Sequence, residues 1–211
     1  MHIPDGFLTP PVWLTLDAIV APAIAWTARG RKTESVESSQ RTPMLGVMGA
    51  FVFAAQMVNF PVALGASGHL LGGTLLSVVL GPSAAALTMT AILVLQALLF
   101  QDGGVLALGA NIFNMAFAGV LAGYLPVWLW GRSKTSVFLG GALSVVASGA
   151  LVLSELKLSG VALAGPATGI ALALFCVTGI LEGAITVAAL RTIERLSPQS
   201  LPEHLPFSPR A

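Results

Sequence analysis

Charged residues are scarce in this sequence. Only 9% of its 211 residues are Asp, Glu, Lys or Arg, whereas a soluble domain carries about 25%. Hydrophobic residues make up 55% of the chain, and the mean hydropathy is +0.88. This balance excludes an ordinary soluble domain and predicts a multi-pass integral membrane protein in a lipid bilayer. The few basic residues are scattered, so the sequence offers no patch that would bind nucleic acid.

Cysteine is nearly absent, and several catalytic motifs are missing. The single cysteine, Cys176, excludes an internal disulfide and lies in an apolar run, where we expect a packing residue. The sequence holds no Gly-x-x-x-x-Gly-Lys-Ser/Thr phosphate loop, so ATP hydrolysis is not expected of this chain. It also holds no His-Glu-x-x-His motif, which counts against an intramembrane metalloenzyme. We therefore expect that the chain is not an enzyme.

Seven apolar stretches predict an all-α membrane protein with about seven transmembrane helices. Six of them cover about 9–28, 43–62, 83–100, 105–130, 136–154 and 161–190, and a short third stretch ends at about Gly81. That third stretch is short for a bilayer core of about 30 Å, so we expect it to tilt or to be partly re-entrant. Residues 1–195 then form a single transmembrane domain, and 196–211 form a cytoplasmic tail that we expect to be flexible.

The basic residues predict the orientation of the chain. With the amino terminus outside and the carboxy terminus cytoplasmic, a single basic residue, Lys157, falls on the outer side. The others all fall inside: Arg29, Arg31, Lys32, Arg41, Arg132, Lys134, Arg191, Arg195 and Arg210. This orientation places Met1, His2, His69 and the Gln101–Asp102 loop together on the outer face.

The first eight residues, Met1-His2-Ile3-Pro4-Asp5-Gly6-Phe7-Leu8, offer metal ligands. No Lys or Arg precedes Arg29, so they do not read as a secretory signal. The free amine of Met1, the backbone nitrogen of His2 and its imidazole can close a five-membered and a six-membered chelate ring on one ion. Nitrogen ligands in one plane suit Ni(II) or Cu(II), and imidazole also suits cobalt and zinc. The chelate requires that Met1 stay on the chain, which the bulky His2 side chain favours. Taken alone, the stretch favours the simpler interpretation that His2 is a chance neighbour of the initiator methionine.

A second histidine, His69, lies in a glycine-rich loop after Ser67 and Gly68. Glycine allows the backbone to approach a ligand closely, and a histidine at the mouth of a membrane protein is a functional candidate. Its imidazole would complete a set of four nitrogens with Met1 and His2. The alternative is an ordinary histidine in an interfacial loop.

Four stretches resemble the CbiM/NikM family of substrate-specific membrane components in energy-coupling-factor cobalt and nickel importers. They are Met1–Leu8, the loop 65–73 that reads Gly-Ala-Ser-Gly-His-Leu-Leu-Gly-Gly, Gln101–Gly104, and 109–116, which reads Gly-Ala-Asn-Ile-Phe-Asn-Met-Ala. They occur in the family's order, and the resemblance as a whole extends over nearly the entire chain. One departure is the absence of a histidine before Glu182, where many relatives have one.

The resemblance implies a seven-helix protein whose amino terminus tucks into the core and binds metal through Met1, His2 and His69. It implies residence in the inner membrane of a prokaryote and uptake of Co(II) or Ni(II) as substrate, with no organic cofactor and a role in supplying cobalamin biosynthesis. The implied partners are a membrane coupling (T) subunit, separate ATPase subunits and a small accessory membrane protein. Because no accessory segment is fused to this chain, that last partner would be a separate polypeptide.

Further polar residues are candidates for the surroundings of the metal. A ligating imidazole usually donates its other ring nitrogen to a carboxylate, amide or carbonyl, and the polar groups near the outer end are Ser67, Gln101, Asn111 and Asn114. The two asparagines are three residues apart and would share a helical face. Hydrogen bonds between helices are the alternative role for such amides.

Two carboxylates lie within predicted spans. For Asp17 and Glu182 we favour structural roles over proton or ion relay, with Thr178 or Thr186 as hydrogen-bond partners of Glu182. Asp5 is expected to fix the amino-terminal turn rather than to bind metal.

Small residues recur every four positions on the second span, at Gly46, Ala50 and Ala54. Such a stripe lets helices pack closely, either inside the protein or against the coupling subunit.

The sequence leaves two alternatives open: the class of substrate and the identity of the metal. A vitamin-binding component of the same importer class would need an aromatic cavity, which one tyrosine and tryptophans mainly at span ends do not supply. Between metals, a planar set of four nitrogens suits nickel, whereas cobalt is the commoner assignment in the family. We expect cobalt, with nickel as the alternative.

Overall fold

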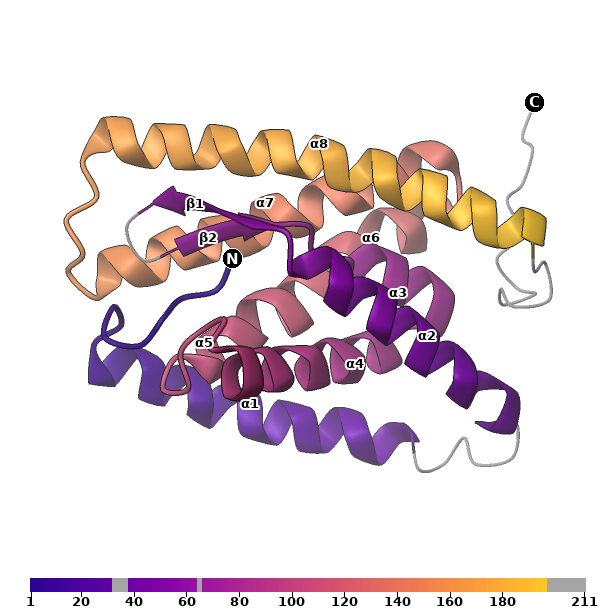
Figure 1. The fold of residues 1–211 in the computed structure, drawn as a ribbon, viewed down its shortest axis with the longest axis horizontal. Coiled ribbons are helices and arrows are strands. Elements are labelled where there is room, and N and C mark those ends of the chain that lie inside the picture. Colours follow the sequence, from indigo (N-terminus) through magenta and orange to yellow (C-terminus); the bar gives the residue numbers. More distant parts are fainter. Residues whose placement is uncertain (32–37, 64–65, 197–211) are drawn as a thin grey trace.

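The computed structural model describes residues 1–31, 38–63 and 66–196, and these fold into a helical bundle with one two-stranded hairpin (Figure 1). The first helices are α1 (Pro10–Arg31) and α2 (Ser38–Gln56), followed by strands β1 (Asn59–Ala63) and β2 (Ala66–His69). Next come the short α3 (Gly73–Leu80) and α4 (Pro82–Leu95), which continues as a π-helix, η1 (Gln96–Phe100). One continuous rod then consists of α5 (Leu108–Ile112), the π-helix η2 (Phe113–Gly119) and α6 (Val120–Trp130). The last two helices are α7 (Lys134–Leu158) and α8 (Gly165–Leu196).

These elements confirm the prediction of a mainly helical membrane protein with seven helical segments in the described part of the chain. Five segments are long and apolar enough to cross a membrane: 10–29, 82–100, 108–130, 134–158 and 165–196. The apolar part of α2, Pro43–Gln56, is shorter. The predicted tail, 196–211, lies outside the described residues apart from Leu196, at which α8 ends.

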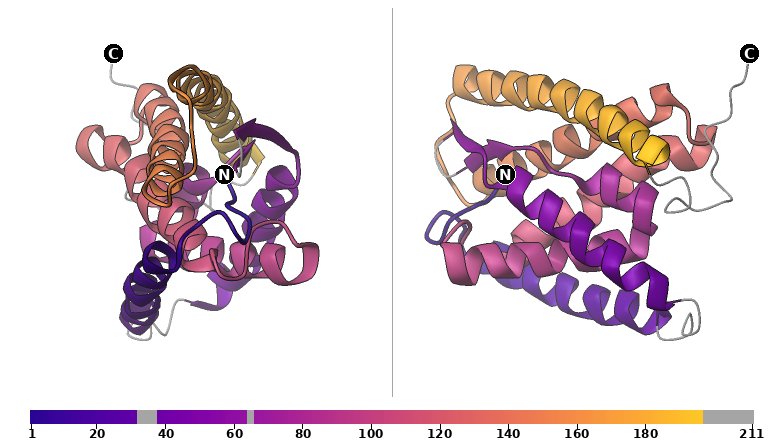
Figure 2. Two further views of the ribbon diagram at one scale, coloured as in Figure 1. Left: turned by 90° about the vertical axis from the view of Figure 1, so that its left-hand side faces the viewer. Right: turned by 45° about the vertical axis from the view of Figure 1, so that its right-hand side comes forward.

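The second and third predicted spans differ from the structure in one respect. The span expected over 43–62 stops being helical at Gln56, and β1 carries the chain onward before β2 returns it toward α3 (Figures 1 and 2). With eight residues, α3 is only about 12 Å long. The hairpin therefore occupies the part of the bundle's length that α2 and the short α3 do not reach. Its strands pair with each other and contact α8, which satisfies backbone groups that could not face lipid.

Helices α7 and α8 pack along most of their length. Glycines make the close approach possible, since a Cβ on Gly141 would lie 2.6 Å from the Cα of Gly183, and one on Gly149 would lie 2.4 Å from the ring of Phe175. By contrast, α1 stands at the edge of the bundle, and only 11% of its most apolar window is buried (Figure 2).

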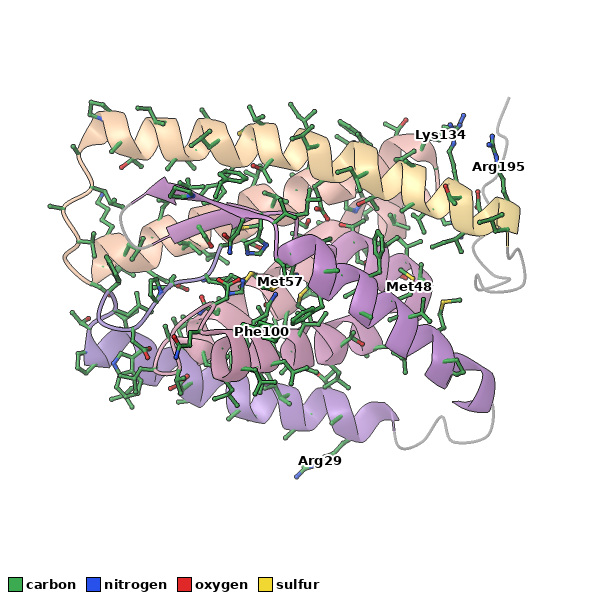
Figure 3. All side chains as sticks on the ribbon, in the orientation of Figure 1. Arg29, Met48, Met57, Phe100, Lys134 and Arg195 are labelled. Carbon is green, nitrogen blue, oxygen red and sulfur yellow. The ribbon has the colours of Figure 1, made fainter. Side chains whose placement is uncertain are left out.

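The two ends of the bundle differ in charge. Arg29, Lys134 and Arg195 lie near the end opposite the loop that follows Phe100 (Figure 3). Arg132 lies in the turn before α7 and forms an ion pair with Glu194 at 2.5 Å. The clustering is the one on which the predicted orientation depends, and the side of the membrane on which each end lies stays a prediction.

Candidate metal site

The amino-terminal segment before α1 turns into the bundle and ends between the hairpin and the α5 region (Figure 1). Met1 and Ile3 are fully buried, and His2 is 4% exposed. Ile3 is held on both sides, because its N–H donates to Asn111 Oδ1 at 2.8 Å and its carbonyl accepts from Asn111 Nδ2 at 3.1 Å. The same carbonyl accepts from Gly104 N at 2.9 Å. These bonds set the depth at which Met1 and His2 enter the bundle.

Asp5 gives the segment a second anchor. Its carboxylate accepts hydrogen bonds from three consecutive backbone N–H groups: Val105 at 3.1 Å, Leu106 at 2.8 Å and Ala107 at 3.3 Å. Gly104 lies so close that any Cβ there would overlap Asp5. The expectation that Asp5 is structural agrees with this geometry, although its partners belong to the distant 101–107 loop rather than to its own turn.

Three potential ligand groups meet where β2 ends. The Met1 amine donates to Ser67 Oγ at 3.1 Å, and the backbone N–H of His2 donates to the same oxygen at 3.3 Å. The imidazoles of His2 and His69 stack with centroids 4.7 Å apart and an interplanar angle of 23°. Met1, His2 and His69 therefore lie together at one buried place, although His69 is 68 positions from Met1 in the chain.

His69 presents one nitrogen without a hydrogen-bond partner. Its Nδ1 lies 2.8 Å from the carbonyl of Leu70, and because a carbonyl only accepts, Nδ1 must carry the proton. Nε2 then bears a lone pair, and this buried atom has no hydrogen-bond partner among the described residues. Buried polar atoms without partners are rare, and a bound ion is one of the accepted reasons.

Burial favours the neutral form of each of these nitrogens. It lowers the pKa of the Met1 amine well below its usual value, against a smaller opposing effect of Asp102. Burial also lowers the pKa of His2, and the neighbouring His69 and amine lower it further. The pKa of His69 falls for the same reason, with a further lowering by the amine. The amine and the imidazoles ligate metals in their neutral forms, so these three groups release few protons when an ion binds, whereas the backbone nitrogen of His2 would have to lose its N–H proton to become a ligand.

Asp102 is a neighbour of this site that the sequence analysis left out of its candidates. Its Oδ2 lies 3.8 Å from His2 Nε2 and accepts from Asn59 Nδ2 at 3.2 Å, and burial raises its pKa. The predicted candidate was the adjacent Gln101, whose side chain is exposed and whose φ is 55°. That left-handed residue turns the chain so that Asp102, not Gln101, faces His2.

The remaining candidates separate into two groups. Ser67 and Asn111 both contact the amino-terminal segment. Asn114 does not, because its Nδ2 donates to Glu155 Oε2 on α7 at 2.8 Å. The two asparagines, which were expected to share a helical face, therefore bond different elements, and the rod becomes a π-helix at Phe113, between them.

The two intramembrane carboxylates accept backbone hydrogen bonds. Asp17 accepts from Gly109 N at 2.9 Å, which joins α1 to α5. Glu182 accepts from Leu71 N at 2.9 Å and Gly72 N at 2.7 Å. The threonine partners expected for Glu182 are wrong, since Thr178 bonds the carbonyl of Leu174 in its own helix.

Within the described residues, no three His, Cys, Asp or Glu side chains gather in a way that could hold a metal. A metal site in this region would therefore depend on the amine and backbone nitrogens of the amino terminus.

The chain is similar to known metal-transport proteins. The family described as "Cobalt uptake substrate-specific transmembrane region" matches residues 2–200. A Haloquadratum walsbyi protein, provisionally named a metal transport protein, is 39% identical over 94% of this chain and 92% of its own length. The "probable fused nickel transport protein LarMN" of Lactiplantibacillus plantarum is 37% identical over 93% of this chain, which spans 59% of that longer protein. The crystal structure of a truncated transition-metal transporter superposes with a TM-score of 0.80 at 32% identity, covering 92% of this chain and 99% of the other.

Proposed function

Because the chain belongs to the CbiM family of cobalt-uptake transmembrane proteins, we propose that it is the substrate-binding membrane component of an energy-coupling-factor importer. Metal transport across the membrane is the function that the family and its relatives share. In our proposal, the chain captures a divalent metal ion at the end of the bundle where its amino terminus is buried. That end faces the outside, and ATP hydrolysis on separate subunits drives release into the cytoplasm.

The convergence of Met1, His2 and His69 is the observation that carries this proposal. In the ligand set that we propose, the Met1 amine, the backbone nitrogen of His2 and His2 Nδ1 form two fused chelate rings on the ion. His69 Nε2 supplies the fourth nitrogen, because its other ring nitrogen is committed to the Leu70 carbonyl. Ser67 keeps the first two nitrogens side by side, and Asp102 lies near His2 Nε2, which would carry the proton once Nδ1 binds metal.

Cobalt is the substrate that we propose, in line with the description of the family, and the ion would serve cobalamin biosynthesis. A specific observation favours nickel as the second candidate. Four nitrogens around one ion are typical of square-planar Ni(II), and nickel lies above cobalt in the order of intrinsic affinities. The nickel name of one relative points the same way.

A second part of the proposal concerns partners. An importer of this class needs a membrane coupling subunit, ATPase subunits and a small accessory membrane protein as a separate chain. The stripe of Gly46, Ala50 and Ala54 is exposed along α2, and a Cβ added to Gly46 would meet no atom within 4 Å. We assign this stripe to docking of the coupling subunit, because it is not used in packing within the described chain.

Equilibrium binding of Co(II) and Ni(II) to the purified protein, separately and in competition, tests the proposal. We expect tight binding of both metals, with the winner of the competition identifying the substrate. His69→Ala should lose affinity by 10-fold or more because it removes one of four ligands. His204→Ala, in the tail outside the described residues, is the matched control and should bind as the wild type does. Equal affinity of wild type and His69→Ala would refute the ligand set.

The docking assignment has its own test. Gly46→Leu combined with Ala50→Leu should prevent copurification with the coupling subunit while metal binding survives. Loss of metal binding together with assembly would show instead that the stripe stabilises the chain itself.

A further inference from the structure

The loop of three residues after His69 is hydrogen-bonded by side chains from two helices. Glu182, which is 2% exposed on α8, accepts from Leu71 N with one carboxylate oxygen and from Gly72 N with the other. Gln56, fully buried at the end of α2, donates through Nε2 to the carbonyl of Leu71 at 2.6 Å. Both the N–H and the C=O of Leu71 are therefore bonded to side chains from outside its own loop.

Leu70 connects these hydrogen bonds to His69. The carbonyl of Leu70 belongs to the same peptide unit as the N–H of Leu71, which Glu182 binds. That carbonyl accepts from His69 Nδ1 at 2.8 Å. Because a peptide unit is planar, fixing the direction of the N–H also fixes the direction of the carbonyl. The position of Glu182 thus determines where the imidazole of His69 is anchored.

Close packing leaves the loop little freedom to adjust. Gly72 has φ of 77°, and a Cβ there would lie 2.7 Å from the side chain of Val52. A carboxylate buried at membrane depth is costly, and nearby Thr178 bonds its own helix instead of Glu182. Both carboxylate oxygens are used on the loop, which points to a role for the loop rather than for packing between helices.

We propose that Glu182 is a positioning residue of the metal site, which acts through the Leu70–Leu71 peptide unit to aim Nε2 of His69 at the ion. This inference rests on the proposed function, since it assumes that His69 ligates the transported metal. It adds that α8 is mechanically coupled to the site. A displacement of α8 relative to the hairpin would withdraw the fourth ligand and weaken metal binding without touching the amino-terminal chelate.

The test compares two buried glutamates in the full-length protein. Glu182→Gln places an NH2 group against a backbone N–H, so one of the two bonds to the loop is lost. Glu155→Gln is the matched control, because Glu155 is also buried but bonds Asn114 and has no bond to the His69 loop in the described structure. We expect Glu182→Gln to lower the affinity for Ni(II) by about 10-fold to 100-fold, the usual effect of removing a residue that orients a metal ligand. Glu155→Gln should bind as the wild type does.

A double-mutant cycle separates positioning from general destabilisation. In the His69→Ala background, Glu182→Gln should have no further effect on affinity, because the residue through which it acts is absent. The absorption band of bound Ni(II) should shift to longer wavelength in both single variants, as an oxygen ligand replaces the imidazole. Glu182→Asp, which keeps the charge but retracts it by one methylene, gives the same comparison with a smaller disturbance of the fold and should show the same His69-dependent loss.

Three results would overturn the inference while leaving the proposed function intact. They are wild-type affinity in both Glu182 variants, an equal loss in Glu155→Gln, or a further loss of the same size in the His69→Ala background. Failure of the wild-type protein to bind either metal would instead overturn the proposed function, and this inference with it.

Discussion

The amino-terminal half of the site and the α7–α8 pair stabilise buried backbone in opposite ways. Helices α7 and α8 satisfy their own hydrogen bonds and need only small residues, such as Gly141 and Gly183, to approach each other. The amino-terminal segment and the loop 70–72 after β2 have irregular backbone, and side chains from distant elements bind them one group at a time. Asn111 and Glu182 are such side chains, and Asp5 of the amino-terminal segment binds the backbone of residues 105–107 in the same way. Irregular backbone is tolerated inside a membrane protein only when protein groups replace water in this way.

This comparison predicts that substitutions in the two regions impair different properties of the protein. Variants in the α7–α8 contact should lose the fold, whereas variants among the anchoring side chains should lose the metal while the bundle persists. The predictions below test this division, from the largest expected effect to the smallest.

Gly183→Leu should have the largest effect. A Cβ at this position would already lie 2.5 Å from the carbonyl oxygen of Phe138 on α7, so a leucine forces the helices apart. Overpacking of this kind costs about 1–3 kcal/mol and occasionally more, and it should appear as a lowered Tm in detergent. Gly169→Leu on the same helix is the control, because a Cβ there meets no atom within 4 Å. A similar Tm for both variants would refute the packing account.

The two asparagines of the α5–η2–α6 rod should separate binding from stability. Asn111→Ala removes both bonds to Ile3, so the amino terminus loses its register and Ni(II) affinity should fall by about 10-fold to 100-fold. Asn114→Ala removes the partner of Glu155 and should lower the Tm while affinity is kept. Titration calorimetry and thermal unfolding of both variants check this, and equal losses of affinity would contradict the assigned faces.

Competition between protons and metal for the amine and imidazole nitrogens should have the next largest effect. The unperturbed pKa values are 8.0 for the amine and 6.5 for the imidazoles, and burial lowers each of them in the folded protein. Protons therefore compete with metal only at a lower pH than they do in an unfolded chain. Ni(II) binding to the protein should persist to lower pH than binding to the free peptide Met-His-Ile-Pro-Asp. Because each pKa is lower in the folded protein, the unfolded chain takes up these protons first as the pH falls. The metal-free protein should therefore lose stability below the unperturbed pKa values.

Two pH titrations of Ni(II) binding, one on the protein and one on the peptide, check this prediction. Coincident midpoints would indicate that the terminal nitrogens are exposed in solution.

Asp102→Asn should have the smallest effect. The carboxylate lies 3.8 Å from His2 Nε2 and its side chain is 16% exposed, so its attraction for a metal-bound imidazole is partly screened by solvent. We expect affinity to fall less than 10-fold, with the ratio of Co(II) to Ni(II) binding unchanged. A loss as large as that of His69→Ala would mean that Asp102 is itself a ligand.

Much of this architecture could be predicted from the sequence, and the exceptions have physical causes. Apolar runs identify membrane helices, but Phe60 and Val62 continue the run of α2 while the chain is already extended, since periodicity does not distinguish a short apolar strand from the end of a helix. The π-helix that begins at Phe113 has no clear signal in the sequence. The bonds from Glu182 to Leu71 and Gly72 join residues more than 100 positions apart and depend on tertiary packing alone.

For the site itself, a terminal chelate could be inferred because its three nitrogens are consecutive along the bonded chain. The nearness of His69 followed from the order of the spans. The identity of the neighbouring carboxylate did not, because the left-handed conformation of Gln101 decides which side of the loop faces inward.

The most direct test of the central claim is a comparison of metal binding by two purified proteins. One begins at Met1, and the other carries two additional residues before Met1, which convert the Met1 amine into an amide and move the free amine away from Ser67. The account predicts that the first binds Co(II) or Ni(II) tightly and that the extended protein, although folded, does not. Equal binding by both proteins would contradict it, because the ion would then be held without the amino-terminal amine.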